Sequence, residues 1–213
     1  MVKNRLLLLL AAASVALSSG AKPLKDLWVD MPDSLLPYLN KSMRTELVDL
    51  FAMQVKANVT NQLGGECVMD TLTHDFVQVS LTEASVLQMK MVPQMSGDSI
   101  LCVVKTLRAP EPESEVMLYD QHWQPLDMSH AFDGCSLQEL QQQLMARPDT
   151  MTESHYQELK AYVEPKMLHA QLSPNDNTLT LGLSLPLVAN EDKKRISPIL
   201  LQMKVKRIGD NVK

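Results

Sequence analysis

The sequence predicts an α+β protein in which helices pack on one face of antiparallel sheets. Two observations predict this class. Apolar residues recur at helical spacing in some segments and alternate strictly with polar residues in others, and short turns join the alternating runs. These segments follow one another as helix, sheet, helix and sheet, which indicates two tandem helix-then-sheet halves. With 45% hydrophobic and 21% charged residues, the chain has the composition of a globular protein.

The N-terminal segment has the three parts of a cleavable secretory signal peptide. Lys3 and Arg5 are positively charged, residues 6–17 are apolar, and small residues follow. This order predicts cleavage after Ala21, with Gly20 as the neighbouring position. The apolar run is shorter than the about 20 residues of a membrane-spanning helix, so an uncleaved anchor is only the alternative. We expect a periplasmic or secreted mature chain without a membrane span.

The first half is predicted over residues 22–107 and opens with a helix. Asn40 or Ser42 can cap this helix, because a short polar side chain can accept a hydrogen bond from the first turn. The apolar residues of the helix share one face: Met43, Leu47, Leu50, Phe51 and Val55.

Strict alternation begins after this helix. Residues 77–81 and 87–91 each place their apolar side chains on one face of a strand. The opposite face carries polar residues, among them Gln78, Gln88 and Lys90. Residues 100–107 are more continuously apolar, as expected of a central strand. The short connections predict antiparallel hairpins with one buried face.

Residues 108–134 are predicted to connect the halves and to contain one strand that ends at Tyr119. The second half, residues 135–213, returns to helices. Ser136 and Glu139 have the spacing of a capping box, in which the side chain of each residue accepts a hydrogen bond from the backbone N–H of the other.

A second helix of this half is expected after Thr152, which can cap it. Alternation then predicts strands over residues 179–185 and 199–205, separated by a charged turn at residues 190–195. The start of the last strand resembles residues 100–105, and this likeness fits a duplication of the helix-then-sheet unit.

The charge of the chain argues against one class of partner. The formal net charge of −5 becomes −7 when Lys3 and Arg5 leave with the signal peptide. An acidic chain without a basic stripe repels phosphate backbones, so we expect no nucleic-acid partner.

The chain has three cysteines: Cys67, Cys102 and Cys135. In an oxidising compartment Cys67 and Cys102 could pair, since both fall in predicted strands. Their apolar neighbours favour buried, unreactive thiols instead. We expect buried thiols and keep the disulfide as the alternative.

Motifs of covalent or metal catalysis are absent from the sequence. No serine lies in a G-x-S-x-G turn, and the cysteines have apolar or acidic neighbours, which do not activate a thiol. The histidines and cysteines lack the spacing of zinc ligands. We therefore expect no cofactor, no metal and no catalytic residue.

Methionine is unusually frequent, at 14 residues. Met89, Met91 and Met95 resemble the thioether clusters that bind Cu(I) in oxidising compartments. The strand alternation gives Met89 and Met91 a simpler explanation, because it places them on the core face.

One group of aromatic and polar residues is a candidate contact site. Tyr119, His122 and Trp123 lie close together in an irregular, polar stretch. Tryptophan is enriched at binding hot spots, so these three side chains can form a small amphipathic patch.

Several segments resemble a family of exported proteins from Bacteroidales that is described as a domain of unknown function. They are residues 31–37 with Arg44 and Asp49, residues 61–65, 106–110, 119–123 and 196–200. The resemblance covers most of the mature chain and implies a Gram-negative periplasmic or outer-surface setting, with no known activity. One departure is Ile208-Gly209, where the family pattern has an aromatic residue.

These observations give one leading hypothesis and two alternatives. The leading hypothesis is an exported, noncatalytic binding or interaction protein of the bacterial envelope, whose partner is an envelope protein or a glycan. One alternative is an envelope hydrolase whose acidic residues converge only in the folded protein. The other is handling of Cu(I) by methionine.

Overall fold

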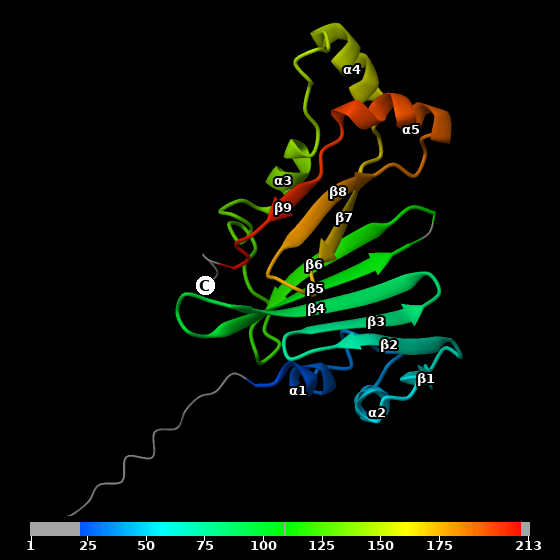
Figure 1. Cartoon of the computed structure of the whole chain (residues 1–213), viewed down its shortest axis with the longest axis vertical. Coiled ribbons are helices and arrows are strands. Elements are labelled where there is room, and N and C mark those ends of the chain that lie inside the picture. The colour runs from blue at the N-terminus through cyan, green and yellow to red at the C-terminus, as the bar shows by residue number, and fades with distance from the viewer. Residues whose placement is uncertain (1–21, 109, 210–213) are drawn as a thin grey trace, which may run out of the picture.

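A computed structural model describes residues 22–108 and 110–209. Within these residues the chain forms two antiparallel sheets, five α-helices and one 3₁₀ helix, η1 (Figure 1). The predicted α+β class is confirmed. The predicted signal peptide, residues 1–21, lies outside the described residues. No helix in the described part is long and apolar enough to cross a membrane.

The larger sheet is a six-stranded meander in which each strand pairs with its neighbour in sequence. Its strands are β1 (Asn58–Thr60), β2 (Glu66–Leu72), β3 (Phe76–Thr82), β4 (Ser85–Pro93), β5 (Ser99–Leu107) and β6 (Glu113–Tyr119). The alternation correctly predicted β3, β4 and β5. The strand expected at Cys67 is β2, whereas β1 was not predicted. β6 lies in the segment expected to connect two halves, but it pairs with β5 and completes this sheet.

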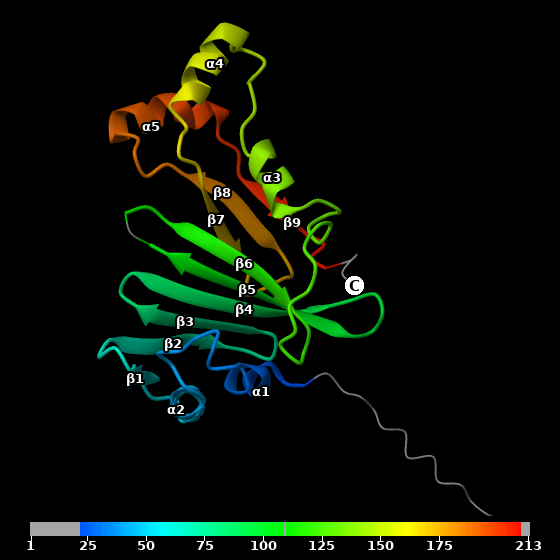
Figure 2. The same ribbon diagram turned by 180° about the vertical axis from the view of Figure 1, so that it is seen from behind.

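Two helices, α1 (Leu24–Val29) and α2 (Lys41–Ala52), cover one face of the larger sheet (Figure 2). Asn40 caps α2, because its side chain accepts a hydrogen bond from the backbone N–H of Met43 at 3.1 Å. Leu27, Trp28 and Leu47 belong to the core between these helices and the strands. The predicted start and cap of α2 are therefore confirmed, but Val55, expected on the apolar face, lies beyond the end of the helix and is exposed.

The smaller sheet packs on the opposite face of the larger one and consists of β7 (Met167–Leu172), β8 (Leu179–Ser184) and β9 (Met203–Val205). Helix α3 (Leu137–Gln143) lies beside it and begins with the predicted capping box. Helices α4 (Glu153–Ala161) and α5 (Asn190–Ile196) and η1 (Ser197–Ile199) form a tip with a separate apolar cluster (Figure 1).

Strand β4 is buried on both faces, although its alternation predicts only one buried face. Gln88 is 6% exposed and Lys90 is 1% exposed, because β7 lies across the polar side of β4. The alternation itself is correct, since Leu87 and Met89 face the helices. The two polar residues face a second layer of protein rather than solvent.

The segment expected to form a charged turn and a long strand has a different structure. Residues 190–196 form helix α5, and only residues 203–205 form a strand. Ile196 and Ile199 bury their side chains in the apolar cluster of the tip, which the helical path allows. Residues 100–105 lie within β5, so the two segments that look alike in sequence adopt different structures.

Candidate functional site

A groove of about 240 Å³ lies between the two sheets. Three strands of the larger sheet and one strand of the smaller sheet line it, together with the β5–β6 connection. We call it the β7 groove; its lining residues are Gln78, Val86, Gln88, Thr106, Arg108, Pro112, His169, Ala170 and Gln171.

The groove runs along the edge of β7 that does not pair with β8. Backbone groups on such an edge need partners, and side chains of the larger sheet supply them. Ser114 Oγ accepts from the N–H of Ala170 at 2.9 Å and donates to its carbonyl at 3.2 Å. Gln88 Oε1 accepts from the N–H of Leu172 at 2.9 Å. These bonds fix the smaller sheet across β4 and β6.

A second hydrogen bond continues from Gln88 along the floor of the groove. Gln78 and Gln88 are direct cross-strand partners in β3 and β4. The Nε2 of Gln88 donates to the Oε1 of Gln78 at 2.8 Å. Gln78 remains half-buried, and no described residue accepts a hydrogen bond from its Nε2.

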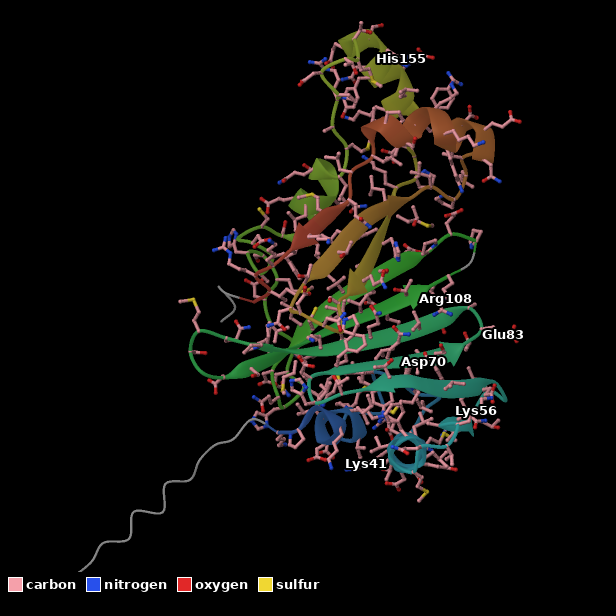
Figure 3. All side chains as sticks on the ribbon, in the orientation of Figure 1. Lys41, Lys56, Asp70, Glu83, Arg108 and His155 are labelled. Carbon is pink, nitrogen blue, oxygen red and sulfur yellow. The ribbon has the colours of Figure 1, made fainter. Side chains whose placement is uncertain are left out.

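Arg108 supplies the positive charge of the groove. Its backbone N–H donates to the carbonyl of Ala84 at 2.7 Å, which joins the end of β5 to the β3–β4 turn. Its side chain is exposed and forms no ion pair with a described residue. Figure 3 shows Arg108 and Glu83 at the same end of the larger sheet. The next loop residues are held by an ion pair of 2.5 Å between Glu111 and Lys193.

A buried ion pair lies further along the path of β7. Lys90 Nζ is 2.8 Å from Asp75 Oδ2 and donates to the carbonyl of Pro174 at 3.3 Å. Burial alone would raise the pKa of Asp75, but the hydrogen bond and charge of Lys90 outweigh it and hold that pKa below 3.8. The pair therefore joins β4, the β2–β3 turn and the β7–β8 turn.

The structure buries two of the three residues of the predicted aromatic patch and leaves the third exposed. Tyr119 and Trp123 are 6% and 7% exposed, with ring centroids 5.3 Å apart. The indole N–H of Trp123 donates to the carbonyl of Leu27 in α1 at 3.2 Å. Both rings thus belong to the core beneath α1, and His122 alone is exposed.

The three methionines considered for Cu(I) lie in different surroundings. Met89 is completely buried, and Met91 packs against the same core. Met95 is 95% exposed in the turn between β4 and β5. In the described part of the chain, no three side chains among histidine, cysteine, aspartate and glutamate come together to hold a metal ion.

A disulfide between Cys67 and Cys102 is excluded by their positions. Cys67 in β2 belongs to the core under the helices, whereas Cys102 in β5 belongs to the core under the smaller sheet. Two strands, β3 and β4, separate them, and all three cysteines are free thiols. Burial raises the pKa of Cys102 to about 12 and also raises that of Cys67. The expectation of buried thiols at these two positions is confirmed.

A second, wider depression of about 760 Å³ lies at the start of α3. Asp127 and Glu139 both line it. Hydrogen bonds from Ser129 lower the pKa of Asp127, and hydrogen bonds from Ser136 lower the pKa of Glu139. Two carboxylates of lowered pKa are both ionised at neutral pH, so this pair does not provide a general acid.

The sequence did not identify the β7 groove. Gln78 and Gln88 were assigned to the polar face of a strand, and β7 itself was not predicted. The available signal was the apolar alternation of residues 179–185. It predicts a second sheet, whose apolar face must be covered by other parts of the chain. Alternation does not specify which polar residues that sheet will meet.

Comparisons with known proteins add a family and a fold. A solved structure of a domain of an uncharacterized protein from Porphyromonas gingivalis superposes with a TM-score of 0.69 and 21% identity, covering 86% of this chain and 92% of that chain. At this identity the likeness concerns the fold. No curated protein matched the chain. A family model described as "Protein of unknown function (DUF3256)" matches residues 16–207, and the chain belongs to that family.

Proposed function

We propose that this chain is an exported, noncatalytic binding protein of the bacterial envelope and that the β7 groove is its binding site. Export is supported by the sequence of residues 1–21, and the resemblance to Bacteroidales proteins supports an envelope setting. An envelope protein or a glycan is the partner class. The observation that carries the proposal is an accessible groove lined by Arg108, whose side chain forms no ion pair with a described residue.

The chemistry of the groove favours binding over turnover. Its polar lining consists of side-chain amides, one hydroxyl, one guanidinium and one imidazole. Amides and a guanidinium form directed hydrogen bonds but are neither nucleophiles nor proton-transfer groups at neutral pH. His169 is the one lining side chain that could transfer a proton.

Affinity capture from an envelope fraction tests this proposal. The bait is the mature protein, compared with Arg108→Glu and with Glu83→Gln, which changes a nearby charge outside the groove. We expect the captured component to be lost with Arg108→Glu and retained with Glu83→Gln. Capture that is independent of Arg108 would refute the groove as the binding site. Turnover of a peptide or glycan library by the pure protein would refute the noncatalytic assignment.

The same material tests the copper alternative. Cu(I) binding by methionine requires thioethers that reach one ion together. Titration with Cu(I) under reducing conditions should give the same result for the wild type and for the Met89→Leu/Met91→Leu double variant. Stoichiometric binding that this variant abolishes would replace the present proposal.

A further inference from the structure

We propose that the β7 groove binds a carboxylate, held by Gln78 and Arg108. This inference deepens the proposed function and rests on it. It follows from the direction of the hydrogen bonds along the groove floor, which determines which groups are left to meet a ligand.

The direction is fixed at one end by the backbone of β7. The N–H of Leu172 can only donate, so the atom of Gln88 that it contacts at 2.9 Å must be the carbonyl oxygen. The other atom of that amide is then the NH₂ group. It donates to Gln78 at 2.8 Å, and the contacted atom of Gln78 must be its oxygen.

This chain of bonds leaves a donor at the groove. The oxygen of Gln78 is occupied by Gln88, and its NH₂ group has no acceptor among residues 22–108 and 110–209. An amide without an internal partner for its donors offers them to a ligand or to water. Gln78 therefore presents N–H groups to the groove.

Arg108 lines the same groove and adds only donors, because a guanidinium has no acceptor. The complementary ligand group is planar, anionic and rich in acceptors, which describes a carboxylate. A phosphate dianion fits less well, since one arginine would face two negative charges in a chain whose net charge is −5. The carboxylate can come from a peptide C-terminus or from an acidic sugar.

The test follows the side-chain NH₂ signals of Gln78 by ¹H–¹⁵N NMR while four probes are added separately. The probes are N-acetyl-dialanine, its C-terminal amide, glucuronate and inorganic phosphate. We expect saturable shifts with at least one of the two carboxylates, and the stronger one identifies the source. The amide and phosphate should cause none. Equal shifts with the amide, shifts with phosphate alone, or no shift with any probe would each overturn the inference.

Three variants of the full mature chain separate charge from folding. Gln78→Glu keeps an oxygen for the bond from Gln88 but replaces the free donor with an acceptor. It should raise the Kd for the carboxylate by at least about tenfold, as should Arg108→Gln. Glu83→Gln, outside the groove, should leave the Kd within about twofold. Unchanged binding by Gln78→Glu, with the Leu172 amide signal in place, would overturn the inference.

This experiment and the envelope capture can fail separately. Envelope capture that still depends on Arg108, with no response to any carboxylate, would leave the binding function in place and refute the carboxylate. Failure of both would refute the binding function together with the ligand class.

Discussion

Lys90 Nζ lies 2.8 Å from Asp75 Oδ2 in a position where the lysine side chain is 1% exposed. The ammonium also donates to the carbonyl of Pro174, which follows β7. A buried ammonium is tolerated when its charge is paired and its protons have acceptors. The pair therefore joins the two sheets at the end of β7 away from the tip helices.

Loss of either partner should destabilise the protein, but by different amounts. Asp75→Asn leaves a buried ammonium without its counter-ion. Removing one partner of a buried ion pair generally lowers the free energy of unfolding by about 3–5 kcal/mol. The Asp75 side chain is 22% exposed, so we expect a smaller loss of about 2–3 kcal/mol. Lys90→Met should destabilise less, since Asp75 can be hydrated. Urea denaturation measures both, and equal stability of Asp75→Asn and the wild type would contradict the ion pair.

The same pair should make stability depend on pH in the acid range. The pKa of Asp75 is held below its ordinary 3.8 in the folded protein. A carboxylate with a lowered folded pKa adds stability that is complete above its unfolded pKa and is lost as pH falls through the folded one. The free energy of unfolding should therefore decrease below about pH 4, and less so in Asp75→Asn. Parallel pH profiles of the two proteins would show that other carboxylates dominate.

Gln88 should contribute to the attachment of β7 to the larger sheet. Gln88→Ala removes the acceptor of the Leu172 N–H and the donor to Gln78. A buried N–H without a partner costs about 1–3 kcal/mol, which is the expected loss on urea denaturation. Gln171→Ala on the same strand is the control, because that side chain is exposed and should change stability by less than about 0.5 kcal/mol. Similar losses in both variants would contradict this role.

Local patterns allowed much of this fold to be predicted. The Asn40 cap, the Ser136 capping box and the strands β3 to β5 each depend on residues within one turn or one hairpin. Such features follow from spacing alone, because the hydrogen bonds and the buried face are set by neighbours in sequence.

The candidate site could not be predicted in the same way. The groove exists because β7 crosses β4 near Gln88, although residues 88 and 172 are far apart in sequence. Trp123 shows the same limit, since its irregular stretch gave no sign that the indole would bond to Leu27. Both features depend on how distant segments dock, which a pattern of polar and apolar residues does not specify.

The thiols should differ sharply in reactivity. Cys102 is fully buried and its pKa is raised to about 12 by burial, and burial also raises the pKa of Cys67. The thiolate is the reactive form, so iodoacetamide at pH 8 should modify the half-buried Cys135 first. All three should react in guanidinium chloride. Mass spectrometry of the digested protein measures this order, and a Cys67–Cys102 cross-linked peptide would contradict the placement of these residues on opposite faces.

Arg44 explains why the segment before α2 holds its shape without regular structure. Its side chain is completely buried, and its guanidinium donates to the carbonyls of Val29, Met31 and Leu39. It also pairs with Asp33 at 2.9 Å, but that carboxylate is 57% exposed.

Arg44→Met would leave these carbonyls without a partner in an apolar environment, and we expect a loss of about 3–5 kcal/mol. Asp33→Asn keeps all three backbone bonds and should cost less than about 1 kcal/mol, because the Asp33 carboxylate is solvent-exposed and such a pair contributes little. Urea denaturation of the two variants measures the difference. If Asp33→Asn were as damaging as Arg44→Met, the ion pair rather than the carbonyl contacts would stabilise this segment.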